Sequence, residues 1–448
     1  MNHPYFPQGD QDLREMMEIV GVSSLEDLFR TIPESIRLKS LLNVPRALPE
    51  QRLVAHLDDL SQRNCLGEAS KRFLGGGAYS HYIPSIIDTV LLRAEFYTSY
   101  TPYQPEISQG GLQALFEFQT MIAGLTGMDV ANASLYDGAT ALVEAVMMAG
   151  RVIKKKKTVL VSRTMHPQYR QVLTTYLQNM DLVVKEIPFQ GSGSVDLAAL
   201  AGMVDEDVFA IAVQTPNYLG VIENLKEIQN LLGDRKIFKI AVTSETLSLA
   251  LLEPPGHFGF DVACGEAQSF GIPLSYGGPY LGFFATRQEY LRQLPGRICG
   301  ETRDSEGKRG FVLTLSTREQ HIRREKATSN ICTNHALCAL AATVYLELYG
   351  RKGLRQLAEV NTIRAHHLRS RLEGIDGISF PLAGPIFNEC VIGLPDGKHE
   401  ELQKRGYTIG PALGDDYPEF KDHYLMAVTE MNEPESLSEL VDAARSLS

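Results

Sequence analysis

The feature that most constrains the fold of this chain is an alternation of helical and strand-like segments that begins near residue 112. Short runs of β-branched and other apolar residues recur through the middle of the sequence, and helical patterns separate several of them. The runs lie at 158–162, 182–187, 208–214, 237–244 and 281–286. Near-continuous apolar strands that alternate with helices are typical of a mostly parallel sheet covered on both faces. We therefore predict an α/β fold.

Helical patterns around these runs suggest the domain boundaries. An apolar stripe at 115–125 ends at Gly127, a second helix is expected at about 140–147, and a long helix is expected to begin near residue 333. We predict an N-terminal helical extension at 1–65, a large α/β domain at 66–330 and a small α+β domain at 331–448.

Composition and charge exclude several classes of function. A formal net charge of −11 argues against a nucleic-acid-binding surface. No window approaches the roughly 18 uninterrupted apolar residues of a membrane span, so we expect no membrane insertion. The N-terminus lacks a basic region followed by an apolar one, and we therefore predict a cytoplasmic protein without a signal peptide. The six cysteines are dispersed, without metal-ligand spacing, so we expect reduced thiols and no metal site.

The segment at 97–111, YTSYTPYQPEISQGG, is the first candidate for a functional surface. It combines three tyrosines and two prolines with Gln104 and Glu106. Thr101 and Gln104 each precede a proline, which favours extended backbone. A rigid segment rich in aromatic and hydrogen-bonding groups can line a pocket or an interface, whereas the alternative is an ordinary surface loop.

The segment at 134–141, SLYDGATA, is typical of a loop that runs into a helix. Helix N-termini offer unpaired N–H groups that bind phosphate, and Ser134, Gly138 and Thr140 are the candidate donors. On pattern alone the simpler interpretation is preferred, in which Asp137 or Ser134 only caps the helix.

The segment at 317–333 carries a group of basic residues. Arg318, His321 and Lys326 are candidates for an anion or carboxylate site, since arginine offers a bidentate fork. The simpler interpretation, a salt-bridged helix face with Glu319 and Arg323 four residues apart, is favoured by the pattern alone.

Several long motifs make the chain similar to the glycine cleavage P-protein family. They are FLGGGAYSHYIP at 73–84, YTPYQPEISQG at 100–110, TGMDVANASLYDG at 126–138, GIPLSYGGPYLGFFA at 271–285 and REQHIRREKATSNICT at 318–333. The resemblance covers nearly the whole chain in order. The length corresponds to the N-terminal half of the single-chain form, or to the first subunit of the form split into two chains. The resemblance implies the aminotransferase-like fold of type I pyridoxal-phosphate enzymes.

The resemblance also implies that this chain lacks the lysine that binds the cofactor. Catalytic members carry that lysine shortly after a strand, a few residues before an Ile-Pro pair. The matching stretch here is 266–273, EAQSFGIP, and Gln268 stands at the lysine position. A glutamine amide cannot form an imine. Glu245 stands near the position of the aspartate that faces the pyridine nitrogen in catalytic members. We therefore expect a degenerate cofactor pocket, with Ser134, Gly138 and Thr140 as a vestigial phosphate loop.

Further expectations follow from the resemblance. Pyridoxal phosphate is expected on a lysine-bearing second subunit, in an α2β2 tetramer. The pair decarboxylates glycine and transfers the aminomethyl group to the lipoyl arm of H-protein, an oxidoreductase step. Residues that reach the partner's active site or its interface are expected in two groups. They are Tyr100, Thr101, Tyr103, Gln104 and Glu106, followed by Arg318, His321 and Lys326.

Two alternatives remain open. In the first, the chain is a structural or regulatory partner that contributes no active-site residue. In the second, it is an independent pyridoxal-phosphate enzyme that uses another lysine, such as Lys239 or Lys308.

Overall fold

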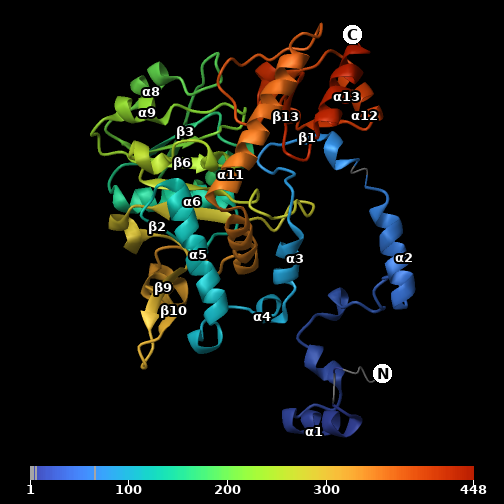
Figure 1. Cartoon of the computed structure of the whole chain (residues 1–448). Coiled ribbons are helices and arrows are strands. Elements are labelled where there is room, and N and C mark those ends of the chain that lie inside the picture. Colours follow the sequence, from blue (N-terminus) through green and yellow to red (C-terminus); the bar gives the residue numbers. More distant parts are fainter. Residues whose placement is uncertain (1–4, 6–7, 65–66, 448) are drawn as a thin grey trace. The chain divides into compact units, whose positions relative to one another are not determined.

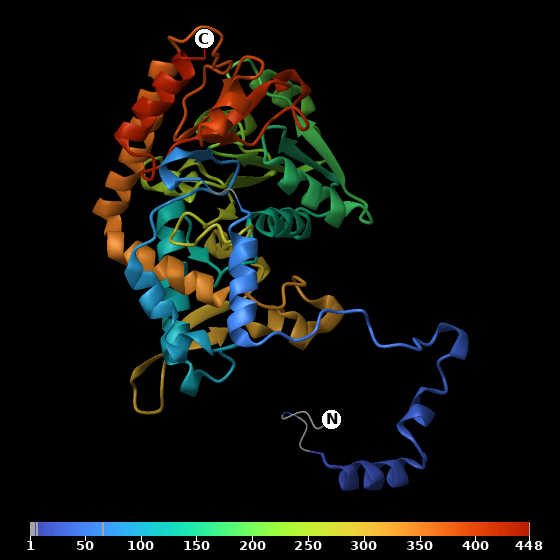
Figure 2. The same ribbon diagram turned by 90° about the vertical axis from the view of Figure 1, so that its right-hand side faces the viewer.

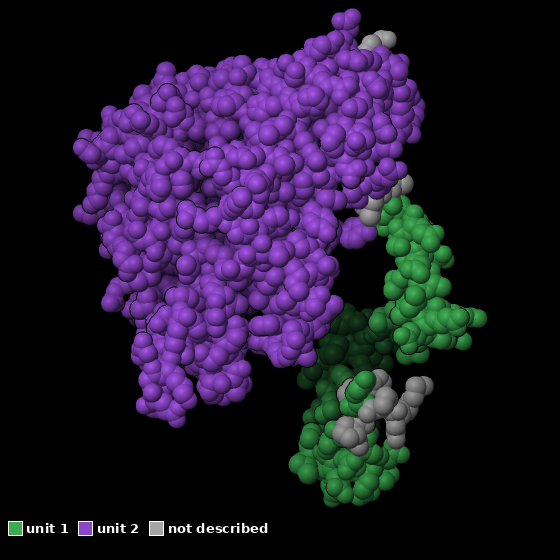
Figure 3. All heavy atoms as spheres, in the orientation of Figure 1, with its two compact units in different colours: residues 1–65 green, residues 66–448 purple. Residues whose placement is uncertain are grey.

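The computed structural model describes residues 5, 8–64 and 67–447, which belong to two compact units (Figure 3). The first unit, Met1–Cys65, contains the helices α1 (Asp10–Val20) and α2 (Glu50–Ser61) joined by turns and extended chain. None of its described residues is buried. This unit therefore has no hydrophobic core of its own within the described residues.

The second unit, Leu66–Ser448, contains the remaining elements (Figure 1). Its strands are β1 (Arg72–Leu74), β2 (Val130–Ala131), β3 (Thr158–Ser162), β4 (Val183–Ile187), β5 (Val208–Gln214), β6 (Phe238–Thr243), β7 (Val262–Glu266), β8 (Gly282–Thr286), β9 (Ile298–Arg303), β10 (Arg309–Thr314), β11 (Glu389–Gly393), β12 (Thr408–Gly410) and β13 (His423–Ala427). Its helices are α3 (Ser85–Leu91), α4 (Ala94–Tyr97), α5 (Gln109–Thr126), α6 (Gly138–Val152), α7 (Pro167–Leu177), α8 (Leu197–Met203), α9 (Leu225–Leu232), α10 (Gln320–Arg323), α11 (Ala336–Leu372), α12 (Lys398–Lys404) and α13 (Pro434–Arg445).

A seven-stranded sheet organises the second unit, in the order β2-β8-β7-β6-β5-β3-β4. The five strands from β7 to β4 pair in parallel, whereas β8 is antiparallel to both of its neighbours. This arrangement confirms the predicted α/β fold with a mostly parallel sheet. All five expected strands are present with ends that differ by at most one residue, while β2, β7 and the β9–β10 hairpin were not predicted.

Alternating side chains along each central strand enter two different cores. On β5, Ile211 and Val213 pack with α5 and α11 on one face, while Ala210 and Ala212 pack with α6 and α7 on the other. All four are fully buried. A sheet buried on both faces needs apolar residues at consecutive positions, which explains why β5 is apolar at six consecutive positions.

The C-terminal elements form a module with a separate core around Leu368, Met426 and Val441. The strand β1 belongs to this module, because it pairs in parallel with β12 and buries Phe73 in the same core. Figures 1 and 2 show this module and the β9–β10 hairpin at opposite ends of the second unit. The division of this unit at residue 330 stays a prediction. The strand β1 lies within the expected large domain in sequence but packs with the C-terminal module.

No helix among the described residues is both long enough and apolar enough to cross a membrane. A cytoplasmic location stays a prediction. The five described cysteines are free thiols: Cys264, Cys299 and Cys390 are buried, Cys338 is partly buried and Cys332 is exposed. The sixth, Cys65, lies outside the described residues.

Candidate functional site

Gln268, at the expected lysine position, is held by three hydrogen bonds to the backbone. Its side-chain oxygen accepts from the Tyr79 N–H at 2.9 Å, and its amide nitrogen donates to the carbonyls of Tyr79 at 3.0 Å and Ile272 at 2.7 Å. The residue is 2% exposed. A buried amide whose donors and acceptor all meet backbone groups is a structural clamp between residue 79 and the turn after β7.

The N-terminus of α6, the expected phosphate position, is occupied by a carboxylate of the same chain. Glu266, the last residue of β7, accepts hydrogen bonds from the Gly138 N–H at 3.0 Å and the Leu281 N–H at 2.7 Å. Burial raises the pKa of Glu266 to about 7. The ionised form of Glu266 is favoured there by the helix dipole, and its oxygen accepts the hydrogen bond that a phosphate would otherwise accept.

The other residues of this loop have mostly internal roles. The Asp137 carboxylate caps α6 by accepting from the Thr140 N–H at 2.7 Å, and the Thr140 hydroxyl donates to the same carboxylate at 2.9 Å. Ser134 is fully buried with a positive φ of 98°, and its hydroxyl has no hydrogen-bond partner among the described residues. The simpler interpretation of the segment, a helix cap at Asp137, is therefore what the chain adopts.

Glu245, near the expected position of the pyridine partner, belongs to a buried ion-pair cluster. His81 lies between two carboxylates, with Nε2 at 3.1 Å from Glu245 and Nδ1 at 2.9 Å from Glu430. Burial opposes the charge of His81, but the two carboxylates outweigh it and raise the pKa of His81 to about 10. Burial would likewise favour the neutral form of Glu430, yet the protonated His81 lowers its pKa to about 2. The Glu245 carboxylate is thus paired with a cation of the same chain.

The glycine loop at 75–77 closes over this region. The Gly76 N–H donates to Glu389 at 2.7 Å, and His166 donates from Nε2 to the Gly76 carbonyl at 2.8 Å. A Cβ atom at Gly77 would lie 2.8 Å from Cδ2 of His166, which explains the need for glycine there. The His166 ring stacks on Tyr169, with centroids 4.6 Å apart, and the Tyr169 hydroxyl packs against Gly138.

These contacts do not fit a cofactor bound in this chain. The imine position holds an amide, the first N–H of α6 is already paired, and the carboxylate at the ring position is paired with His81. Neither of the two alternative lysines lies at the imine position. Lys239 lies on the second residue of β6, at the amino end of the strand, and Lys308 lies in the exposed turn between β9 and β10.

The segment at 97–111, called the tyrosine segment below, has several exposed polar side chains. Tyr100 is 90% exposed and Tyr103 is 54% exposed, and Gln104 and Glu106 are exposed as well. Among the described residues, the side chains of Tyr100, Thr101, Gln104 and Glu106 make no hydrogen bond. The segment is anchored at its end by Gln109, which donates to and accepts from the Phe311 backbone at 2.8 Å.

Two of the predicted residues are brought together on this surface. The rings of Tyr103 and His321 lie with their centroids 5.9 Å apart. Between them and the interior stands Arg297, which is 3% exposed and donates to the Tyr103 hydroxyl at 3.1 Å. Arg297 is a residue that the sequence analysis did not single out.

Arg318 and Lys326 lie differently. The Arg318 guanidinium is buried and donates to the backbone carbonyls of Leu315, Leu294 and Gly296, so its donors hold the turn before Arg297. Lys326 is exposed in a short 3-10 turn. The expected ion-pair face does not form as a continuous helix, because α10 is only four residues long.

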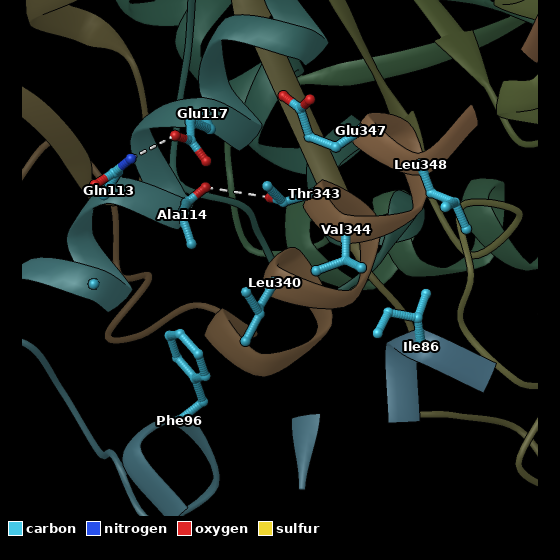
Figure 4. Close-up of a pocket in the computed structure, with 11 residues that line it drawn as sticks. Ile86, Phe96, Gln113, Ala114, Glu117, Leu340, Thr343, Val344, Glu347 and Leu348 are labelled. Atoms are coloured by element: carbon cyan, nitrogen blue, oxygen red, sulfur yellow. Dashed lines mark hydrogen bonds between the residues drawn. The ribbon is translucent and has the colours of Figure 1, made fainter. Parts of the chain in front are cut away.

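A groove of about 490 Å³ lies beside the tyrosine segment (Figure 4). Its walls come from α3, α4, α5 and α11, and its lining is mostly apolar, including Ile86, Phe96 and Leu340. The polar side chains in its lining are Gln113, Glu117, Thr343 and Glu347, and Gln268 is not part of the lining. This groove has the character of a packing surface, not of a catalytic pocket.

Sequence reasoning missed several residues of the region around Gln268. Tyr79 and His81 lie in the motif at 73–84, but nothing in that motif assigns them a role. Glu389 and Glu430 lie far along the chain, outside the quoted motifs. Glu266 could have been found from the sequence. It is a carboxylate at the end of an apolar run, two residues before the lysine position, and a carboxylate buried there needs hydrogen-bond donors.

Comparisons with known proteins agree on one family. The family described as "Glycine cleavage system P-protein" matches residues 3–444. The probable glycine dehydrogenase (decarboxylating) subunit 1 of Geobacillus thermodenitrificans is 49% identical over 445 residues, which cover 99% of this chain and 98% of the relative. The corresponding protein of Brevibacillus brevis is 48% identical over 440 residues, covering 98% and 97%.

Solved structures give the same result. A glycine decarboxylase (P-protein) of the glycine cleavage system, in inhibitor-bound form, has a TM-score of 0.88 and 42% identity, with 100% of both chains covered. Glutamate decarboxylase of Lactobacillus brevis has a TM-score of 0.68 at 12% identity, covering 94% of this chain and 96% of that one, which shows the shared fold. A C-DES variant with glycine covalently linked to its PLP cofactor has a TM-score of 0.61 at 12% identity, covering 89% and 99%. The chain therefore belongs to the glycine cleavage system P-protein family and has the fold of type I pyridoxal-phosphate enzymes.

Proposed function

We propose that this chain is the lysine-lacking subunit of a two-chain glycine decarboxylase. A lysine-bearing second subunit holds pyridoxal phosphate, and two copies of each chain form an α2β2 tetramer. One observation carries the proposal. The groups that would bind a cofactor in this chain are paired with its own backbone and side chains. In the tyrosine segment, by contrast, the side chains of Tyr100, Gln104 and Glu106 are exposed and make no hydrogen bond among the described residues.

The tyrosine segment is proposed to complete the second subunit's active site. Phenol and carboxylate groups, such as those of Tyr103 and Glu106, can orient a small amino acid and exclude water at a shared pocket. Exposed aromatic and aliphatic residues cluster here, with Tyr97 at 62%, Tyr100 at 90% and Ile107 at 77% exposure. Large exposed apolar and aromatic side chains are enriched at protein interfaces, which supports contact between this surface and the second subunit.

The substrates follow from the family. Glycine is proposed to lose carbon dioxide at the cofactor of the second subunit, which supplies an electron sink when bound. The aminomethyl group is then proposed to pass to the lipoyl arm of H-protein, whose disulfide is reduced. This chain's part is to orient glycine and to shield the reacting carbon from water.

The test is reconstitution with the second subunit, followed by glycine–bicarbonate exchange of each chain alone and of the pair. We expect exchange only with the pair, and no visible imine absorbance after the isolated chain is dialysed against pyridoxal phosphate. A borohydride-stable adduct on a lysine of this chain would contradict the assignment of the cofactor to the partner.

Substitutions within the pair test the contribution of the tyrosine segment. Tyr103→Phe and Glu106→Gln are expected to lower exchange by roughly tenfold or more, as removal of a positioning hydrogen bond does. Tyr176→Phe and Glu227→Gln are matched controls, because Tyr176 is 53% exposed and both residues lie on other helices, α7 and α9. Full activity of both segment variants would leave only a structural role for this chain.

A further inference from the structure

Arg297 joins the tyrosine segment to the interior through four hydrogen bonds. Nη1 donates to the side-chain oxygens of Thr333 at 3.1 Å and Asn334 at 3.2 Å. Nη2 donates to the Cys332 carbonyl at 2.9 Å and to the Tyr103 hydroxyl at 3.1 Å. One guanidinium therefore fixes the position of Tyr103 relative to the segment at 332–334.

Burial of the charged Arg297 guanidinium is energetically unfavourable. The residue is 3% exposed, and its Nε atom is buried without a hydrogen-bond partner among the described residues. The Glu319 carboxylate lies 3.8 Å from Nε, too far for a hydrogen bond but close enough to offset the charge. Burying a guanidinium is unfavourable in most settings, so a tie between backbone segments alone would be made more cheaply by neutral groups.

The geometry around Tyr103 leaves its hydroxyl proton available. Because the phenol oxygen accepts from Arg297, its own O–H points away from the guanidinium. The guanidinium also lies against the aromatic face, with Cζ 5.4 Å from the ring centroid, and the ring of His321 adjoins it at 5.9 Å. Tyr103 is thus held on several sides while it stays half-exposed.

We infer that Arg297 is a positioning residue, which fixes the Tyr103 side chain as a hydrogen-bond donor toward the second subunit's active site. This inference rests on the proposed function, since it assumes that Tyr103 faces that site. Lysine cannot replace Arg297 in this role, because an ammonium group lacks the planar fork that sets two Nη directions at once.

The experiment is a double-mutant cycle in the reconstituted complex, with exchange of glycine and bicarbonate as the rate. The variants are Arg297→Lys, Tyr103→Ala and the two combined. Arg287→Lys is the matched control, because Arg287 also donates to backbone carbonyls, those of Phe260, Gly127 and Gly256, and none of these residues belongs to the tyrosine segment. Glycine KM, kcat, the melting temperature and the affinity of the two subunits are measured for each complex.

We expect Arg297→Lys to lower kcat roughly fivefold or more with the subunit affinity unchanged, as a small displacement of a positioned group does. In the Tyr103→Ala background the same change is expected to lower kcat by less than about twofold, because Arg297 acts through Tyr103. The control is expected to lower the melting temperature and to keep kcat within about twofold of wild type.

The results that overturn the inference are distinct from those that overturn the proposed function. If Tyr103→Ala lowers kcat but Arg297→Lys does not, or if the two factors multiply in the double variant, Arg297 is not a positioning residue and the proposed function stands. If Tyr103→Ala has wild-type kcat, the role of Tyr103 is lost and the inference with it. Should Arg297→Lys fail to fold, Arg297→Gln combined with Glu319→Gln removes both buried charges and serves in the same cycle.

Discussion

Restoring the missing lysine is the most direct perturbation of the filled pocket. In Gln268→Lys, the ammonium can still donate to the carbonyls of Tyr79 and Ile272, but the Tyr79 N–H loses its acceptor. An unpaired buried donor costs about 1–3 kcal/mol, and placing a charge at a site that is 2% exposed adds several kcal/mol more unless the amine is neutral. We therefore expect the free energy of unfolding to fall by about 3–5 kcal/mol.

The assay combines urea unfolding of the isolated subunit with absorbance after addition of pyridoxal phosphate. We expect destabilisation and no visible imine band, because Glu266 occupies the phosphate position and Glu245 is paired with His81. Gln288→Lys is the control, since Gln288 is exposed and the same change should shift stability by at most about 0.5 kcal/mol. A Gln268→Lys variant of wild-type stability that forms a borohydride-stable adduct would refute the claim that this pocket is filled.

Three other predictions concern the same unit. In Glu266→Gln, the new amide NH2 group would face the N–H of Gly138 or Leu281, so one backbone donor loses its acceptor. The free energy of unfolding, measured in urea, should fall by about 1–3 kcal/mol. Because the pKa of His81 is raised from 6.5 to about 10 by Glu245 and Glu430, the folded state keeps a proton that the unfolded state releases, so stability should fall between pH 6.5 and 10. In His81→Gln, urea midpoints at pH 7 and 9.5 should lose that difference; an unchanged slope would disprove the assignment. A chain of residues 66–448 should unfold cooperatively, with the melting temperature of the full chain within a few degrees, since the core clusters lie in that unit; loss of its transition would count against an independent unit.

The large sheet was predictable because its strands need continuous apolar residues. The runs at 158–162 and 208–214 matched β3 and β5 at both ends. The missed strand β7, with the sequence VACGE, contains a glycine and ends in a carboxylate, both of which are disfavoured in strands. Its strand conformation is imposed by pairing with β6 and β8, which are 20 or so residues away on either side, and no local pattern carries that information.

The candidate site was predictable only where a motif coincides with the chemistry. Gln268 and the tyrosine segment are local motifs, and Asp137 sits where a helix cap is expected. Arg297 and Glu389 act through partners about 200 and 310 residues away along the chain, such as Tyr103 and Tyr79. Such contacts arise only when the tertiary fold brings the segments together.

The internal pairing of Gln268, Glu266 and Glu245 also contributes to the stability of the unit. Each group that would contact a cofactor now satisfies a buried partner of its own chain: Gln268 the Tyr79 backbone, Glu266 the α6 N-terminus, and Glu245 the charge of His81. Unpaired buried polar groups are destabilising, so these internal partners stabilise the folded unit. A single reversion then removes one of these contacts before any cofactor contact replaces it. Recovery of cofactor binding in this chain would therefore require changes at all three positions together, whereas the outward-facing Tyr103 depends on none of them.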